Sequence, residues 1–210
     1  MSDKSISGRI NAQLTAVAFF TSPTRRIYSR RMGQMAELIM LTGGSYTAHL
    51  DTEAGRQTIT ARAGDIVYWS ADVVRTEESD PTQPLSCICI YFQWPGAPAD
   101  LPYRIHDDRH VVDLLADRLL TVAHDPADKL TRSNPLANAY LDAILAEFIT
   151  LVRDSRHGMV ASITRFIEEH ITEPIRLETL ARHVDLDKNH FGRKYKRLTG
   201  RTPIQDVLSR

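Results

Sequence analysis

The residues best suited to bind another molecule lie near the carboxyl end of the sequence. The stretch from Asp187 to Arg201 contains six basic residues and one acid. The basic residues are Lys188, Arg193, Lys194, Lys196, Arg197 and Arg201. Ammonium and guanidinium groups form charge-assisted hydrogen bonds with phosphate, and an arginine can also bind a guanine edge through two donors. The stretch therefore predicts a contact with nucleic acid, with a basic face that meets only solvent as the alternative.

Two short helices joined by a tight turn would position these side chains. The first helix is predicted from apolar residues at helical spacing, which are Leu177, Leu180, Ala181 and Val184. Asp185-Leu186 follows as the turn, and Asp187 is a suitable N-cap for a second helix. Gly200 is expected to end that helix, since glycine adopts the left-handed conformation common at helix carboxyl ends.

The second helix is predicted to have two unlike faces. Phe191, Tyr195 and Leu198, spaced four and three apart, face inward. The opposite face carries Lys188, Asn189, Arg193, Lys196 and Arg197. Two short helices, a tight turn and a basic outer face are typical of a DNA-binding helix-turn-helix.

This segment resembles the AraC/XylS-type bacterial transcription regulators. The matching stretches are Leu177-Glu-Thr-Leu-Ala, Val184-Asp-Leu-Asp and Phe191-x-Arg-x-Tyr-Lys, followed by Thr199-Gly and Pro203. The family usually has glycine where this chain has Asp185, and aspartate tolerates a left-handed backbone better than most residues. The predicted DNA-binding residues on this helix are Lys188, Asn189, His190, Arg193, Lys196 and Arg197. The resemblance places Asn189, Gly192 and Arg193 nearest the DNA bases, although Gly192 has no side chain to read them.

The same resemblance extends to the rest of the chain. Many members carry an N-terminal cupin-like β-barrel that binds a small effector, followed by helices that dimerise. Ala63-Gly-Asp-Ile-Val-Tyr matches the usual Gly-Asp turn of that barrel. Family members have two helix-turn-helix units joined by a long helix, and this sequence stops at Arg210, within what would be the joining helix. We therefore expect a truncated DNA-binding domain in a fragment of a longer protein.

The predicted barrel offers few metal ligands. Metal-dependent cupins resemble one another in a His-x-His…Glu cluster and a later histidine. Here His49 stands alone, position 51 is Asp51, and Arg75 stands where the later histidine often falls. A transition-metal site needs three or four nitrogen or oxygen ligands. His106 and His110 are four apart but are interpreted as part of a solvated turn. We therefore expect no metal, no cofactor and no catalytic residues.

A binding pocket is the better role for the barrel. The candidate effector-binding residues are the polar and aromatic side chains on predicted strands, namely Tyr46, His49, Tyr68, Arg75 and Tyr91. Arg75 is expected to form a two-pronged pair with a carboxylate of an anionic effector.

Length and composition favour an α+β protein in three segments. The chain has 210 residues, 26 Lys and Arg against 26 Asp and Glu, and so no net charge. Residues 1–105 are predicted to form the cupin-like barrel, residues 106–156 a helical linker, and residues 157–210 the first half of the DNA-binding domain. The last segment holds ten basic and seven acidic residues. Its local excess of positive charge is not visible in the net charge of the whole chain, which is zero.

The linker is predicted to dimerise. Its apolar residues recur at helical spacing over a wide arc, with Leu141, Leu145 and Ile149 as a flanking row. The main row is Leu136, Tyr140, Ile144, Phe148, Leu151 and Val152. We expect this helix to pack against both the barrel and a second surface, with a homodimer through Tyr140, Ile144, Phe148, Leu151 and Val152. Ile144→Glu is expected to give a monomer if Ile144 lies at that interface, or an unfolded chain if Ile144 is core.

The remaining signals concern the compartment. The longest apolar run, from Cys87 to Phe92, has six residues, whereas a membrane helix needs about 20. Cys87 and Cys89 are interpreted as small buried residues, which favours a reducing, cytoplasmic location without membrane contact.

Together these signals predict a ligand-responsive transcription regulator. Double-stranded DNA, a small effector and a second copy of the chain are its expected partners, with RNA polymerase as a further candidate. The alternatives are a metal-dependent cupin enzyme, or a dimerisation or protein-interaction module that does not bind DNA.

Overall fold

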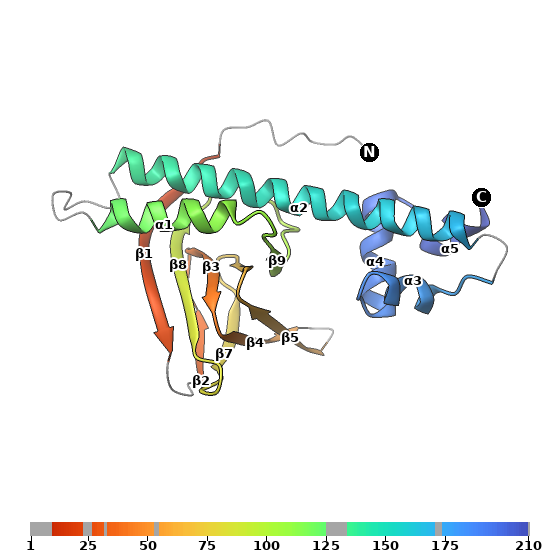
Figure 1. The fold of residues 1–210 in the computed structure, drawn as a ribbon, viewed down its shortest axis with the longest axis horizontal. Coiled ribbons are helices and arrows are strands. Elements are labelled where there is room, and N and C mark those ends of the chain that lie inside the picture. The colour runs from red at the N-terminus through yellow and green to blue at the C-terminus, as the bar shows by residue number, and fades with distance from the viewer. Residues whose placement is uncertain are drawn as a thin grey trace. The chain divides into compact units, whose positions relative to one another are not determined.

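The computed structural model describes residues 10–22, 27–31, 33–52, 55–124, 134–170 and 174–209. They belong to two compact units, Met1–Leu151 and Val152–Arg210 (Figure 1). The first unit combines antiparallel sheets with helices, and the second contains helices. The predicted α+β class is therefore confirmed.

Two antiparallel sheets form the body of the first unit. In chain order the strands are β1 Gln13–Ser22, β2 Ile27–Arg31, β3 Ala36–Gly43, β4 Ser45–Thr52, β5 Gly55–Arg62, β6 Asp65–Trp69, β7 Val74–Ser79, β8 Leu85–Gln93 and β9 Arg104–His106. One sheet has the order β1-β8-β3-β6-β9 and the other β2-β7-β4-β5. This interleaving of strands that are distant in sequence is that of a jelly roll, the double-sheet architecture of cupins. The predicted cupin-like domain is confirmed by this topology.

The alternation of side chains along each strand sets the core between the sheets. It contains Ile39, Leu41, Val67, Trp69, Cys87 and Cys89 from one sheet and Tyr46, Ala48 and Leu50 from the other. The two thiols lie 3.7 Å apart, and both cysteines are buried, as predicted. The turn between β5 and β6 favours glycine, because Gly64 has φ 83°, a backbone conformation that other residues rarely adopt.

Helices α1 (Val111–Ala123) and α2 (Pro135–Glu169) follow the strands. The early part of α2 packs in the first unit, where the Phe148 ring lies 5.7 Å from that of Tyr68 and Oδ1 of Asn138 accepts a 3.0 Å hydrogen bond from the Leu14 amide. By length and composition alone, α2 could cross a membrane. Its apolar face is used inside the fold, however, because Ile144 and Phe148 are fully buried.

This burial corrects the predicted dimer face. Ile144 and Phe148 are 0% exposed and Val152 is 5% exposed, so the side chains at the centre of that face belong to the core of the chain. A stripe that packs on a sheet and one that packs on a second copy have the same spacing in sequence. The periodicity identified the helix correctly but could not identify its partner.

The second unit begins within α2 and continues through α3 (Leu177–His183), α4 (Lys188–Thr199) and α5 (Pro203–Leu208). Its core contains Met159, Ile163 and Ile167 of α2, Leu180 and Ala181 of α3, and Phe191 and Tyr195 of α4. The inward positions predicted for Phe191 and Tyr195 are confirmed, and Leu198 packs against the same core.

Candidate nucleic-acid interface

The turn between α3 and α4 is tight and well bonded. The Leu186 amide donates to the Ala181 carbonyl at 3.0 Å, which folds the chain back on α3. Asp185 has φ 51°, a left-handed conformation that explains why glycine is usual at this position in the related family. Ala181 is 2% exposed, so its small side chain allows close packing in the core.

Both ends of α4 are capped as predicted. Oδ1 of Asp187 accepts hydrogen bonds from the amides of Asn189 at 3.0 Å and His190 at 2.8 Å. Gly200 ends the helix with φ 78°. An N-cap of this kind stabilises a helix by about 1 kcal/mol. The sequence therefore fixes where α4 begins and ends before any partner binds.

Side-chain contacts then lock the orientation of α4. The Tyr195 hydroxyl donates to Oδ2 of Asp206 in α5 at 2.5 Å. Thr202 and Gln205 form a reciprocal capping box at the start of α5, with Pro203 in the first turn. Because Tyr195 is also fully buried, α4 has little freedom to rotate about its axis.

All six predicted DNA-binding residues are exposed on α4. They are Lys188, Asn189, His190, Arg193, Lys196 and Arg197. Asn189, Arg193 and Lys196 follow one another at intervals of four and three and so share the face opposite Phe191 and Tyr195. This face combines an amide, a guanidinium and an ammonium group, which are the donors and acceptors used to bind bases and phosphates.

Three other polar groups of α4 are partly engaged within the protein. Nζ of Lys188 lies 2.5 Å from Oε1 of Glu178, and this hydrogen bond is the main cause that lowers the pKa of Glu178. Burial and the nearby Lys194 lower the pKa of His190, which therefore favours the neutral form at neutral pH. Burial, followed by Arg156, lowers the pKa of Lys194. The basic side chains of α4 that are available to contact DNA are therefore those of Arg193, Lys196 and Arg197.

The first unit contains a buried polar cluster between its sheets. Arg75 is 2% exposed; its Nε donates to Oε1 of Glu77 at 2.7 Å and its Nη2 pairs with Glu37. The Tyr46 hydroxyl donates to the same Glu77 oxygen at 2.8 Å, and Nε1 of Trp69 donates to Tyr46 at 3.1 Å. The Arg75 guanidinium carbon also lies 4.7 Å from the centre of the Trp69 ring.

This cluster corrects the role expected of Arg75. Burial alone would lower the pKa of Arg75, but Glu77 and Glu37 outweigh it and hold that pKa above its usual value. Burial, followed by Glu77, also raises the pKa of Tyr46. Arg75 thus has two internal carboxylates as partners, and we do not place an effector carboxylate there.

The five predicted effector-binding residues do not converge. Tyr46 and Arg75 meet in the buried cluster, and Tyr91 is partly buried against the same core. His49 lies on the outer face, where its Nδ1 is 3.0 Å from Oγ1 of Thr58. Tyr68 packs instead against Phe148 of α2. Neighbouring strand positions face opposite sides of the sheet, so a set chosen by residue type alone is divided between the two faces.

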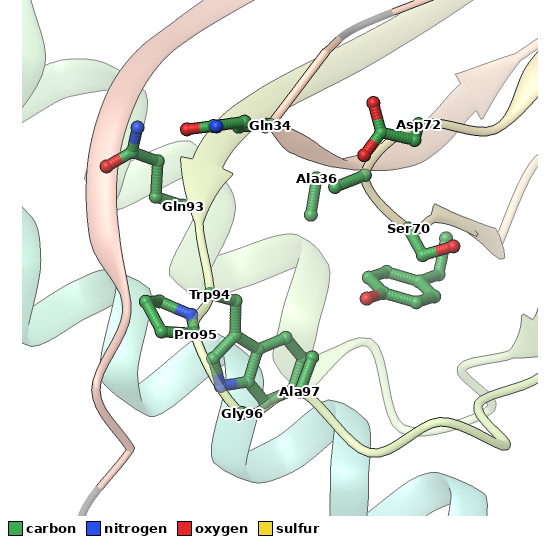
Figure 2. Close-up of a pocket in the computed structure, with 11 residues that line it drawn as sticks. Gln34, Ala36, Ser70, Asp72, Gln93, Trp94, Pro95, Gly96 and Ala97 are labelled. Carbon is green, nitrogen blue, oxygen red and sulfur yellow. The ribbon is translucent and has the colours of Figure 1, made fainter.

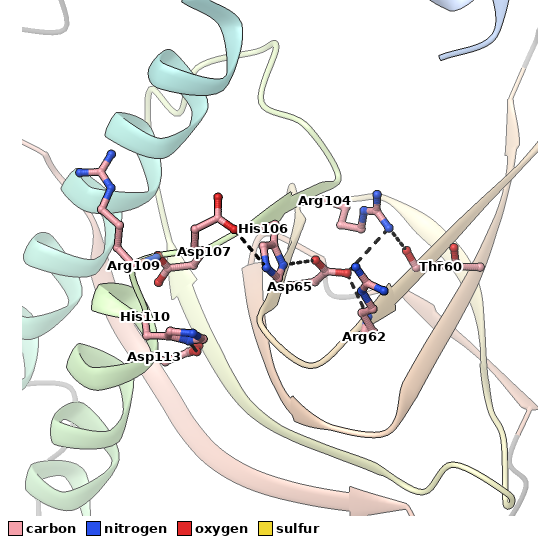
Figure 3. A network of polar contacts seen from close by, with 10 residues as sticks. Thr60, Arg62, Asp65, Arg104, His106, Asp107, Arg109, His110 and Asp113 are labelled. Atoms are coloured by element: carbon pink, nitrogen blue, oxygen red, sulfur yellow. Dashed lines mark hydrogen bonds and ion pairs between the residues drawn. The ribbon is translucent and has the colours of Figure 1, made fainter. Parts of the chain in front are cut away.

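His106 and His110 also have separate partners (Figure 3). His106 Nδ1 lies 2.8 Å from Oδ1 of Asp65 and its Nε2 lies 3.3 Å from Oδ1 of Asp108, whereas His110 Nδ1 lies 3.3 Å from Oδ2 of Asp113. The contact between His106 and Asp65 links β9 to the start of β6. Within the part of the chain that the structure describes, no three histidine, cysteine, aspartate or glutamate side chains gather to hold a metal ion.

Sequence reasoning missed a pocket at one end of the β3, β6 and β8 strands (Figure 2). It has a volume of about 460 Å³ and is lined in part by Gln34, Tyr68, Asp72, Gln93 and Trp94. Only Tyr68 among these was a predicted site residue. The lining residues come from segments up to 63 positions apart in sequence, from Gln34 to Ala97. No local sequence motif therefore predicts this pocket.

The helix-turn-helix segment has a match among known protein families. Residues 167–205 match the family described as bacterial regulatory helix-turn-helix proteins, AraC family. This range contains α3, the turn, α4 and the start of α5. The resemblance to AraC/XylS-type regulators inferred from the sequence is thereby confirmed.

The chain is also similar to the MmsAB operon regulatory protein of Pseudomonas aeruginosa. The two are 27% identical over 156 residues, which is 70% of this chain and 50% of that protein. The chain therefore spans about half the length of the curated relative that it matches.

Two solved structures are among those to which the chain is similar. Apo ToxT from Vibrio cholerae has a TM-score of 0.43 at 11% identity and covers 91% of this chain and 77% of its own. The protein YhaK from Escherichia coli has a TM-score of 0.39 at 16% identity and covers 51% of this chain and 48% of its own.

Proposed function

We propose that this chain, which carries an AraC-type helix-turn-helix at residues 167–205, acts as a ligand-responsive transcription regulator. In this proposal α4 enters the major groove of DNA and the jelly roll binds a small effector. The observation that carries the proposal is the outer face of α4, where exposed basic residues stand on a helix capped at both ends and fixed by its core. The MmsAB operon regulatory protein, by its name, regulates an operon, which supports the same role here.

The residues of α4 are assigned by their place along the outer face. Arg193 lies at its centre, six positions after the Asp187 cap, and is proposed to bind a guanine edge with two donors. Asn189, one turn earlier, has the side chain that pairs with adenine. Lys196 and Arg197 lie further along and are proposed to contact phosphates, which fix the register without reading sequence.

Base and phosphate roles predict different losses on substitution. In a protein that carries both helix-turn-helix units, Arg193→Ala should weaken binding to the preferred site by about 1–3 kcal/mol and relax preference at one base pair. The 210-residue chain alone should bind duplexes weakly and with a strong dependence on salt. Lys196→Ala should weaken binding to all duplexes alike and lower the slope of log affinity against log salt by about one. Fluorescence anisotropy titrations at several salt concentrations measure both effects.

Arg118→Ala is the matched control, because Arg118 is an exposed basic residue on α1, which belongs to the first unit. It should leave DNA affinity unchanged. A uniform loss over all sequences for Arg193→Ala would show that Arg193 holds the backbone only. If the chain binds no duplex at low salt, the protein-interaction alternative replaces the proposal.

Gly192 gives a second test of the same interface. Gly192 lies inside α4, four positions after Lys188 and four before Lys196, so the three residues share one side of the helix. A Cβ on Gly192 would make only an ordinary 3.9 Å contact with Leu177. Packing therefore does not require glycine, although glycine costs a helix about 0.5–1 kcal/mol relative to alanine. We propose that it allows close approach of DNA. Gly192→Ala should stabilise the second unit by about that amount, seen as a higher melting temperature by circular dichroism, yet bind DNA less tightly.

Gly158 in α2 is the control for this substitution, since a Cβ there meets nothing within 4 Å. Gly158→Ala should give a similar stabilisation without a loss of DNA affinity. Equal or tighter DNA binding by Gly192→Ala would contradict the close approach.

The other partners belong to the same proposal. A second copy of the chain and RNA polymerase remain expected from the family resemblance, as does a cytoplasmic location. The dimer face, however, must use side chains other than the buried centre of α2. Sedimentation equilibrium of the chain measures its oligomeric state.

A further inference from the structure

Arg156 lies on the side of α2 that packs in the core of the second unit. Met159 and Ile163 of α2 are buried in this core together with Phe191 of α4. Arg156 precedes Met159 by three positions and Ile163 by seven, so it continues the same stripe along the helix. Its side chain is partly buried. Arg156 therefore lies on the face of α2 that packs against α4, although it is the charged member of an otherwise apolar stripe.

Two basic residues of α4 lie close to Arg156. Lys194 is partly buried and Arg197, three positions later on the same side of α4, is exposed. Burial lowers the pKa of Lys194, and the charges of Arg156 and Arg197 lower it further. A cation has this effect on a lysine when it is a near neighbour. Arg156, Lys194 and Arg197, which we call the basic cluster, thus gather three positive charges from two helices.

The positive charge extends from the basic cluster along α4. His190 lies one turn before Lys194. Burial and then Lys194 lower the pKa of His190, and Arg193 and Arg197 lower it further against the opposing effect of Asp187. Like charges that the fold holds together repel one another, and a bound anion would remove that repulsion. This side of α4 therefore has the electrostatic character of an anion-binding surface.

The position of the basic cluster favours the DNA backbone as the anion. Arg197 follows Lys196 directly, so the cluster adjoins the outer face of α4 that is proposed to enter the major groove. Phosphates border that groove, and a recognition helix meets them along its flank. A guanidinium binds phosphate oxygens through paired N–H donors. Because it has several such donors, Arg156 can bind a phosphate and also keep a partner within the protein.

We infer that Arg156 contacts a phosphate of duplex DNA and extends the interface of α4 onto α2. This inference deepens the proposed function and rests on it. Arg156 lies outside residues 167–205, the segment that matches the AraC family. The helix that contributes Ile144 and Phe148 to the core of the first unit thus also contributes a DNA contact in the second.

Replacing Arg156 with glutamine tests this contact. Arg156→Gln removes the charge and keeps much of the aliphatic stem, and glutamine is a good helix former. In fluorescence anisotropy titrations of the 210-residue chain with labelled duplexes of unrelated sequence, the variant should bind all of them less tightly. The slope of log affinity against log salt should fall by about one. Arg156→Lys keeps the charge and should retain the slope.

Arg165→Gln is the matched control, because Arg165 is exposed and lies nine positions after Arg156, on the opposite side of α2. It should leave affinity and slope unchanged. If Arg156→Gln behaves like Arg165→Gln while Lys196→Ala still lowers the slope, the inference is overturned and the proposed function stands. If the chain binds no duplex at low salt, both are overturned.

Two further measurements separate a phosphate contact from other roles of Arg156. Circular dichroism should show the native fold and an equal or higher melting temperature for Arg156→Gln, because the lost cation faces other cations; an unfolded variant would make Arg156 a structural residue and overturn the inference. Isothermal titration with inorganic phosphate provides the second measurement. Phosphate binding that Arg156→Gln abolishes, with duplex affinity unchanged, would assign the basic cluster to a small anion and also overturn it.

Discussion

Replacing Arg75 with alanine should lower the free energy of unfolding of the jelly-roll unit by about 3–5 kcal/mol. The guanidinium lies between Glu37 and Glu77, and all three side chains are 2% exposed or less. Their removal from water is offset in the native protein by mutual attraction and hydrogen bonds. Without Arg75 the two carboxylates stay buried and lose their shared cation, which leaves a large uncompensated cost.

Urea unfolding followed by tryptophan fluorescence measures this loss. The sequence has two tryptophans, and Trp69 and Trp94 both lie in the first unit, so their emission reports on that unit alone. Arg56→Ala is the control, because Arg56 forms a surface ion pair with Asp51 at 3.9 Å. Exposed pairs of this kind contribute about 0–1 kcal/mol.

A triple substitution tests the cause of the loss. Glu37→Leu, Arg75→Met and Glu77→Leu together remove every charge of the cluster, and buried ion pairs replaced by apolar side chains often keep or gain stability. The triple variant should therefore recover much of what Arg75→Ala loses. If Arg75→Ala alone unfolds at the same urea concentration as Arg56→Ala, the cluster is not a stabilising ion network.

The helix-turn-helix could be predicted from sequence because its signals are local. The Asp187 cap, the left-handed Asp185 and Gly200, and the inward Phe191 and Tyr195 all lie within 16 residues. Each depends on hydrogen bonds or spacing inside one helix or turn, which a single sequence displays directly. The exposed basic face follows once the inward face is known.

The barrel residues were harder to assign because their partners are remote. Arg75 meets Glu37 across 38 positions, and Tyr46 meets Glu77 across 31. Residue types singled out Tyr46 and Arg75 as candidate effector-binding residues, but the pairing of β3, β4 and β7 decides which side chains they meet. His49 shows the same limit, since its position on β4 places it on the outer face while Tyr46 lies inside.

The α2 helix offers the sharpest contrast between pattern and packing. Its apolar arc predicted both a helix and a homodimer face, and the structure uses the centre of that arc as core. Ile144→Glu should therefore unfold the first unit rather than release a folded monomer. Ile144 is fully buried, and a carboxylate placed there without a partner costs more than about 4 kcal/mol. A cost of that size is comparable to the whole free energy of unfolding of many domains.

Leu136→Glu is the matched control on the same helix, because Leu136 is 54% exposed. It should change the free energy of unfolding by no more than about 0.5 kcal/mol. Ile144→Ala adds an uncharged comparison and should cost about 2–5 kcal/mol through the cavity it leaves. Circular dichroism and tryptophan fluorescence report folding, and sedimentation equilibrium reports mass. A soluble Ile144→Glu chain with native spectra and half the native mass would restore Ile144 to a dimer interface, since a core position cannot carry that charge and remain folded.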